Sequence, residues 1–168
     1  MITRALFGAV RRDYLDVFFA LTKHFDVDVK ATYGAAVGGT LLHDAAEKRA
    51  VCIAEHLLRS EDVDLRATNY FGKTALHLAL SSNSTDMARM FLQCDARRAQ
   101  ARRAINLPCD LGKTPLMYAL RVGTDFEIIR LMLSERSSDT SVIDHRGQCV
   151  LHYAAGSGLV DALSLLLE

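Results

Sequence analysis

The sequence has no net charge, because its 20 lysines and arginines are balanced by 20 aspartates and glutamates. A neutral chain lacks the overall basic field that drives non-specific binding to nucleic acids or to membranes. Half of its 168 residues are apolar and 24% are charged, a balance that is typical of folded globular proteins rather than disordered ones. The composition therefore predicts a folded chain and argues against a nucleic-acid partner.

Paired cysteines and long apolar runs are also missing. Cys52, Cys94, Cys109 and Cys149 form no C-x-x-C motif, which predicts reduced, unpaired thiols. The longest run without a charged residue or histidine covers residues 31–42 and is too short to cross a membrane as a helix. Arginines interrupt the N-terminal segment, unlike the apolar core of a signal peptide. We therefore expect no membrane insertion and a location in the cytoplasm or nucleus, where thiols stay reduced.

The motifs of common catalytic and phosphate-binding sites are absent from the sequence as well. The chain contains no G-x-x-x-x-G-K-[ST], no G-x-G-x-x-G, no G-x-S-x-G and no H-E-x-x-H pattern, each of which places a defined set of reactive or phosphate-binding groups. We therefore predict that this chain is not an enzyme and that it uses no cofactor and no metal.

A short block of residues recurs four times along the chain. The copies are TLLHDAA at 40–46, GKTALHLA at 72–79, GKTPLMYA at 112–119 and GQCVLHYAA at 147–155. Their leucines, Leu42, Leu76, Leu116 and Leu151, are separated by 34, 40 and 35 residues. Each copy is followed by an apolar doublet, at Leu57-Leu58, Phe91-Leu92, Met132-Leu133 and Leu166-Leu167. A repeat of this period predicts a stacked array of supersecondary units.

The repeated block resembles the ankyrin repeat, whose G-x-T-P-L-H-x-A-A start and Leu-Leu doublet recur at this period. The resemblance implies an all-α repeat solenoid, built from stacked helix-turn-helix units with short β-hairpin loops. We interpret the chain as one domain over residues 1–168. Its units are a degenerate N-terminal capping repeat (1–36), a repeat at 37–68, a repeat with an arginine-rich insertion at 69–106, a repeat at 107–141 and a last repeat at 142–168 that we interpret as truncated.

Both ends of this division leave an alternative open. Residues 1–36 lack the Thr-Pro-Leu-His start, so they form either a capping repeat or a non-repeat helical pair that covers the edge of the stack. The sequence stops directly after the doublet Leu166-Leu167, which favours a natural protein that continues. The alternative is that the last unit is itself the cap.

Local residues account for the helix starts and for the recurring histidines. Thr74 and Thr114 are placed to cap the first helix of their units, and His43, His77 and His152 follow a helix-start residue by three positions. We interpret these histidines as structural, because no thiol or carboxylate cluster accompanies them. Two of the helix-to-helix turns carry Arg49 and Asn83 in place of glycine, and we expect these turns to be looser.

The basic run from Arg97 to Arg103 is the main local charge feature. The favoured interpretation is a solvated helix extension whose arginines pair with acids of the neighbouring unit. The alternative is a signal for nuclear import or for a phosphate-bearing partner. No aromatic residue interleaves with these arginines, so a stacking platform for single-stranded nucleic acid is not indicated.

The resemblance implies that a protein or peptide partner binds the concave surface formed by hairpin tips and first helices. Candidate partner-binding residues at positions that the repeat leaves free are Tyr70, Phe71, Lys73, Leu78, Leu111, Lys113, Tyr118, Arg121, Arg146 and Tyr153. Tyrosine and arginine dominate interface hot spots. The alternative for Tyr118 and Tyr153 is that they pack on the next hairpin.

A second functional hypothesis is that the array is the substrate-recruiting or autoinhibitory part of a larger enzyme. Its catalytic part would then lie beyond residue 168, and the array would contact that C-terminal region within the same molecule. The sequence of these 168 residues does not decide between this role and a free-standing protein-binding module.

Overall fold

The computed structural model describes residues 2–25, 27, 38–60, 63–94, 103–134 and 138–168. Within these residues the chain forms ten α-helices that follow one another in pairs. They are α1 (Ile2–Arg11), α2 (Leu15–His24), α3 (Leu41–Lys48), α4 (Val51–Arg59), α5 (Ala75–Ser81), α6 (Thr85–Leu92), α8 (Pro115–Val122), α9 (Phe126–Ser134), α10 (Val150–Gly156) and α11 (Val160–Leu167).

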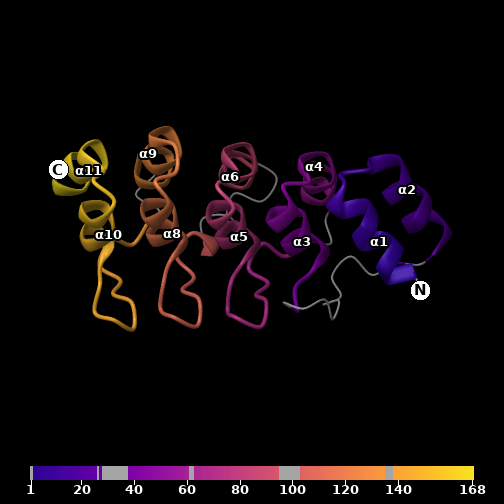
Figure 1. Ribbon diagram of the computed structural model, residues 1–168, viewed down its shortest axis with the longest axis horizontal. Helices are drawn as coiled ribbons and strands as arrows, with labels where there is room; N and C mark the ends of the chain where they lie inside the picture. The colour runs from indigo at the N-terminus through magenta and orange to yellow at the C-terminus, as the bar shows by residue number, and fades with distance from the viewer. Residues whose placement is uncertain (1, 26, 28–37, 61–62, 95–102, 135–137) are drawn as a thin grey trace.

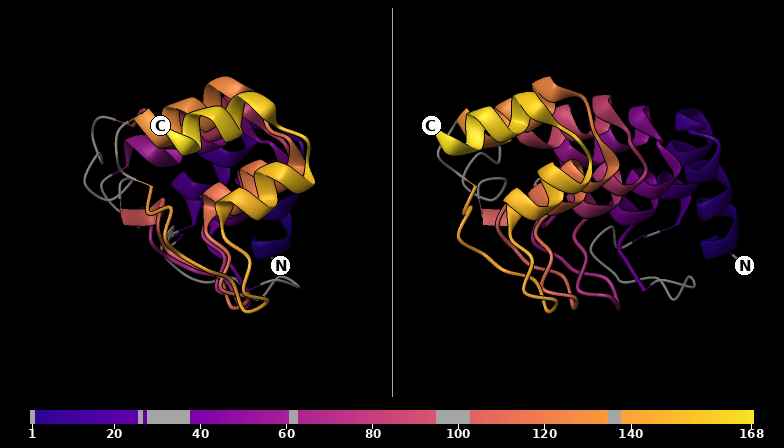
Figure 2. Two further views of the ribbon diagram at one scale, coloured as in Figure 1. Left: turned by 90° about the vertical axis from the view of Figure 1, so that its left-hand side faces the viewer. Right: turned by 60° about the vertical axis from the view of Figure 1, so that its left-hand side comes forward.

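The helix pairs stack side by side into an elongated array (Figure 1). The first helices of the pairs, α1, α3, α5, α8 and α10, form one row in which each contacts the next, and the second helices form a parallel row. Loops between the pairs project away from the helices on one side (Figure 2). The all-α repeat solenoid expected from the sequence is confirmed.

Three of the projecting loops end in hairpin turns, at residues 69–73, 109–113 and 144–148, whose backbones bond to one another. Each is closed by a backbone pair, such as the N–H of Asn69 donating to the carbonyl of Lys73 at 2.9 Å. The N–H of Asp110 also donates to the carbonyl of Phe71 in the preceding hairpin at 3.1 Å. Gly72 takes a φ of 66° at this junction, and a Cβ there would lie 2.7 Å from the Asp110 nitrogen. Glycine is therefore required where the hairpins meet.

Threonine and histidine side chains fix the starts of α3 and α5. Thr74 donates its backbone N–H to Nδ1 of His77 at 3.1 Å, and its hydroxyl lies 2.9 Å from the same nitrogen. Nε2 of His77 lies 3.1 Å from the carbonyl oxygen of Lys113 in the next hairpin. His43 makes the same contacts with Thr40 and with the Lys73 carbonyl. These histidines are therefore structural links between neighbouring units.

The turns between the paired helices share one backbone conformation although their residues differ. Arg49 and Asn83 have φ values of 62° and 52°, close to the 69° of Gly123 and the 67° of Gly158. Asp13, in the turn of the first pair, has a φ of 53°. Arg49 and Asn83 thus take the same left-handed conformation as glycine, and the expectation of looser turns there stays a prediction.

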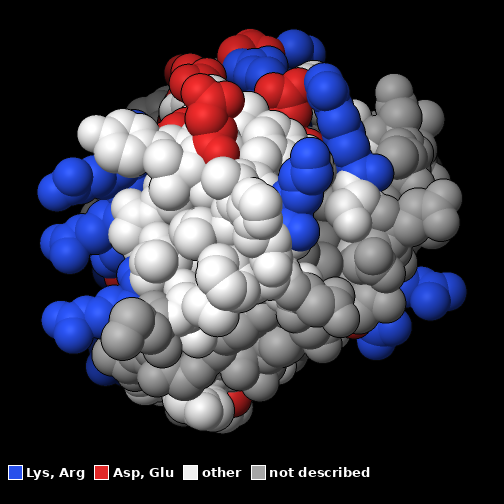
Figure 3. Space-filling model, turned by 90° about the vertical axis from the view of Figure 1, so that its right-hand side faces the viewer, with Lys and Arg blue, Asp and Glu red and all other residues white. Residues whose placement is uncertain are grey.

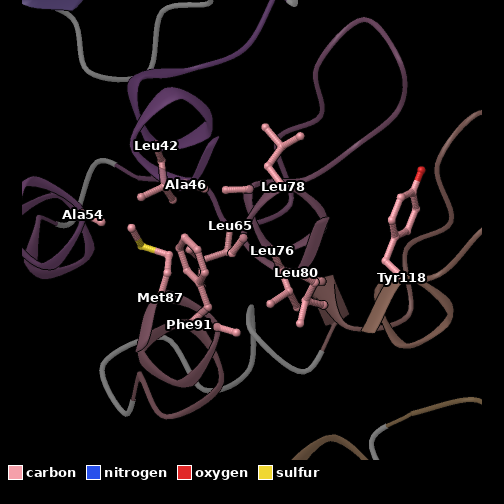
Figure 4. Close-up of a cluster of buried hydrophobic side chains, with 14 of the residues drawn as sticks. Leu42, Ala46, Ala54, Leu65, Leu76, Leu78, Leu80, Met87, Phe91 and Tyr118 are labelled. Carbon is pink, nitrogen blue, oxygen red and sulfur yellow. The ribbon is translucent and has the colours of Figure 1, made fainter. Parts of the chain in front are cut away.

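The core lies between the two rows of helices and continues from unit to unit. Met87 and Phe91 of α6 point toward the α3–α4 pair, where Ala46 and Ala54 leave room for them (Figure 4). Small alanines at these positions let neighbouring pairs approach closely, so that each unit buries its apolar side against the next.

The two ends of the stack expose apolar side chains. Figure 3 views the N-terminal end and shows a broad uncharged area with lysines and arginines at its margin. In the segment of α2, Tyr14, Val17 and Phe25 are 52%, 46% and 42% exposed. Leu151 and Leu167 are exposed at the other end. The outer face of the first pair is therefore less polar than a capping repeat requires, and the assignment of residues 1–36 to such a repeat stays a prediction.

Candidate protein-binding surface

Three of the predicted partner-binding residues are apolar and lie exposed at the tips of the hairpins. Tyr70, Phe71 and Leu111 are 71%, 53% and 56% exposed. The ring of Tyr70 lies against the backbone of Gly38, so its position is held by the preceding unit. Large apolar side chains that remain this exposed on ordered turns are typical of interaction sites.

Tyr118, Tyr153 and Leu78 lie inside the stack, which corrects the expectation that these positions are free for a partner. Their exposed fractions are 4%, 8% and 8%. The hairpins cover the tyrosines, because each ring lies against a residue of the turn that precedes its own helix. The alternative given for the two tyrosines was packing on the next hairpin; both do pack on a hairpin, but it is the one that precedes their own helix.

The hydroxyl of Tyr153 donates to Oδ2 of Asp144 at 2.6 Å. The other carboxylate oxygen of Asp144 accepts the backbone N–H groups of Arg146 and Gln148 at 2.8 and 2.9 Å. Burial and the bond to the Asp144 carboxylate raise the pKa of Tyr153. No sequence pattern indicated Asp144, which is only 4% exposed and holds the last hairpin together.

Tyr118 makes a weaker contact at the equivalent place. Its hydroxyl lies 3.8 Å from Sγ of Cys109. This contact is longer and weaker than a hydrogen bond between two oxygen atoms. The edge of the His77 ring meets the Tyr118 ring with centroids 5.5 Å apart. Burial is the main reason that the pKa of Tyr118 rises to about 12.

Cationic side chains lie over the buried tyrosine rings. Nζ of Lys73 is 5.0 Å and the guanidinium carbon of Arg121 is 5.3 Å from the centroid of Tyr118. Nζ of Lys113 is 5.2 Å from the centroid of Tyr153. Such cation–π contacts hold a charge in place without neutralising it. We call Lys73, Lys113 and Arg121, together with the exposed Arg146, the basic row.

The end of this surface nearest the N-terminus is acidic instead. Asp44 lies in the first turn of α3, and its Oδ2 is buried without a hydrogen-bond partner among the described residues. Burial, followed by the nearby charge of Glu47, raises the pKa of Asp44 to about 6. Glu47 itself is paired with Lys48 at 3.3 Å.

Other features fall outside the hairpin surface. The basic run from Arg97 to Arg103 lies outside the described residues except for Arg103, which is exposed. An open groove of about 460 Å³ lies between the N-terminal turns of α9 and α11, where Phe126 and Val160 are exposed. Nothing in the sequence pattern indicated this groove.

The described residues offer neither a metal site nor a membrane-spanning helix. In that part of the chain no group of three or more histidine, cysteine, aspartate or glutamate side chains is placed to hold a metal ion. No helix among the described residues is both long and apolar enough to cross a membrane.

The comparison with known protein families decides the identity of the fold. The family model of ankyrin repeats, in three copies, matches residues 6–102 and again residues 97–168. The chain belongs to the ankyrin repeat family. Ankyrin repeats are in general protein–protein interaction modules and are typically not catalytic. The hairpins and helix pairs are the parts of this repeat.

Individual proteins with similar repeats include the neurogenic locus notch homolog protein 1 of several vertebrates. The chain is 30% identical over 131 residues to the protein of Xenopus tropicalis, and equally similar to those of Mus musculus and Homo sapiens. In each case the match covers 78% of this chain and 5% of the relative. This ankyrin domain therefore spans only a small part of the relatives that it resembles.

Proposed function

We propose that this ankyrin domain binds a segment of a partner protein along the hairpin side, and that the segment combines apolar with acidic residues. The observation that carries the proposal is the arrangement of exposed apolar tips beside the basic row. Tyr70, Phe71 and Leu111 offer contact area, and the cations over Tyr118 and Tyr153 offer fixed positive charge.

Preorganisation supports this choice of surface. The hairpins are tied together by backbone hydrogen bonds, and the cations rest on rings that are themselves buried. A partner segment therefore orders few groups when it binds, which lowers the entropic cost of association. The domain is neutral as a whole, so the attraction for an acidic segment is local to this side.

The proposal is tested by selecting peptides from a random displayed library against the domain. The central variant replaces Tyr70, Phe71, Leu111 and Arg146 with alanine. We expect selected peptides to be enriched in acidic and apolar residues and to bind this variant at least about tenfold more weakly, as hot-spot truncation does. Circular dichroism of both proteins establishes that the variant is folded.

A matched control variant removes apolar area elsewhere. Phe126 and Val160 line the groove between α9 and α11, and replacing both with alanine leaves the hairpin side unchanged. This control is expected to bind the selected peptides like the unmodified domain. Equal binding by the tip variant, or a loss confined to the groove variant, contradicts the proposal.

We place the domain in the cytoplasm or nucleus. The support is that Cys52, Cys94, Cys109 and Cys149 are free thiols in the fold, as is usual in reducing compartments. Imaging the full-length protein with a fluorescent fusion tests this placement, and a secreted signal contradicts it.

A further inference from the structure

The last repeat replaces the capping threonine with a cysteine. Cys149 occupies the place of Thr40 and Thr74 at the start of the first helix. Its backbone N–H donates to Nδ1 of His152 at 3.2 Å, and its Sγ lies 3.1 Å from the same nitrogen. The repeat therefore brings a thiol and an imidazole into hydrogen-bond distance, the arrangement that activates a sulfur nucleophile.

This pair differs from the inner units in what covers it. Nε2 of His43 and of His77 each lie about 3 Å from a carbonyl oxygen of the following hairpin, and both rings are buried. His152 is exposed and Cys149 is partly exposed. No described residue bonds to Nε2 of His152. Solvent and small molecules therefore reach the thiol–imidazole pair, and a proton on its ring can be shared with water.

Cys52 and Cys109 lack this combination of access and activation. Cys52 is fully accessible, but a hydrogen bond with Asp13 and the charge of that carboxylate raise the pKa of its thiol. Cys109 is buried against the Tyr118 hydroxyl. Hydrogen bonds from the backbone and the ring of His152 lower the pKa of the Cys149 thiol, against the opposing effect of desolvation. Exposure alone therefore does not determine which of these cysteine thiols is the most reactive.

We propose that Cys149 is a site of oxidation by hydrogen peroxide and that His152 activates its sulfur. The thiol proton moves to Nδ1 of His152, which releases the hydrogen bond from the Cys149 backbone N–H, and the thiolate attacks one oxygen of the peroxide. A sulfur–oxygen bond forms while the oxygen–oxygen bond breaks, which oxidises the sulfur to a sulfenic acid by two electrons. The departing hydroxide takes the proton from the imidazolium, so that one water leaves and the ring returns to its neutral form.

The test treats the reduced 168-residue domain with limiting hydrogen peroxide in the presence of dimedone, which traps sulfenic acids. Peptide mass spectrometry then follows the label at each cysteine over time. We expect Cys149 to be labelled about fivefold or more faster than Cys52, because the larger thiolate fraction outweighs its lower intrinsic nucleophilicity. Labelling of Cys52 at an equal or higher rate overturns the proposal.

A His152→Met variant separates activation from a structural role. Methionine already occupies the matching position as Met117, next to the capping Thr114. If His152 activates the sulfur, this variant slows labelling of Cys149 several-fold. If the ring only supports the helix start, its removal loosens the cap and leaves labelling equal or faster, which contradicts the proposal.

A Cys149→Thr variant restores the residue that caps the other repeats and tests the assignment of the label. We expect it to fold like the parent by circular dichroism and to lose the early dimedone adduct while Cys52 keeps its slow rate. An early adduct that persists in this variant places the reactive thiol elsewhere and also overturns the proposal.

Discussion

The unit of α5–α6 and the unit of α10–α11 carry the same helix-start pattern with different outcomes. In the inner unit Thr74 and His77 are buried, and the ring reaches across to the hairpin of the next unit. In the last unit Cys149 and His152 keep the local bonds but face solvent. One motif therefore links neighbouring units at α5 and is a solvent-accessible pair at α10. The position of the motif in the stack, and not the motif alone, determines how much it contributes to the free energy of unfolding.

The largest contrast between these units is expected from removing their histidines. We expect His77→Ala to lower the free energy of unfolding by about 3 kcal/mol, because it leaves a cavity and unpairs the Lys113 carbonyl. His152→Ala removes an exposed ring and is expected to cost less than about 1 kcal/mol. Urea unfolding followed by circular dichroism measures both. Equal costs contradict the difference drawn between the units.

Acid is expected to weaken the inner unit next. Burial lowers the pKa of His77 from 6.5 to about 4, so between these values the unfolded chain binds a proton that the folded chain does not. Stability is therefore full above about pH 6.5 and falls toward pH 4, by roughly 3 kcal/mol for this group. Burial lowers the pKa of His43 in the same direction.

Asp44 opposes this loss of stability in acid, and its substitution serves as a control. Its pKa is raised to about 6 from 3.8, so the folded chain takes up a proton there and gains relative stability as the pH falls through 6. Asp44→Asn removes this compensation and is expected to steepen the loss of stability between pH 6 and 4. Denaturation curves at several pH values that show the same slope for both proteins contradict the assignment.

Gly72 and Gly147 allow the inner unit and the last unit to be compared at a backbone position. Gly72→Ala adds a Cβ that meets the Asp110 backbone, whereas at Gly147 no described atom lies within 4 Å of the added carbon. Both have positive φ, so both pay the left-handed strain of about 1–2 kcal/mol. We expect Gly72→Ala to be less stable than Gly147→Ala by about a further 2 kcal/mol. Thermal unfolding of the two variants side by side measures the difference.

The smallest contrast is expected between the two buried tyrosines, and it runs the other way. Tyr153→Phe leaves Oδ2 of Asp144 without its 2.6 Å donor and is expected to cost about 1–2 kcal/mol. Tyr118→Phe removes only the 3.8 Å contact with Cys109 and is expected to cost less than about 0.5 kcal/mol. The same urea titration compares them, and a larger loss for Tyr118→Phe contradicts this ranking.

Local sequence predicted the elements well because their causes lie within a few residues. Thr74 and His77 form the start of α5 through bonds that span three positions, and the period of the leucines indicated the stacking. Arg49 and Asn83 show where a local rule was too strict. A backbone bond across each turn, such as Ala50 N–H to the Ala45 carbonyl at 2.9 Å, holds the left-handed conformation without glycine.

The candidate surface was predicted less completely because exposure depends on how each hairpin folds over its helix. Tyr70, Phe71 and Leu111 follow from their place at a turn, where side chains point outward. Tyr118 and Tyr153 occupy positions that the repeat pattern leaves variable, yet partners nine residues earlier in the chain bury them. Contacts of this kind become visible only when the hairpins are folded back over their helices.

The junction between the last two units differs from the inner junctions because Met117 replaces the histidine. This methionine stands where His43 and His77 extend a ring to the next hairpin, so the junction between α8–α9 and α10–α11 lacks that hydrogen bond. In a linear array each junction contributes its own share of cooperativity. We therefore expect the α10–α11 unit to open before the inner units of α3–α4 and α5–α6, so that its amide protons exchange with solvent ahead of theirs.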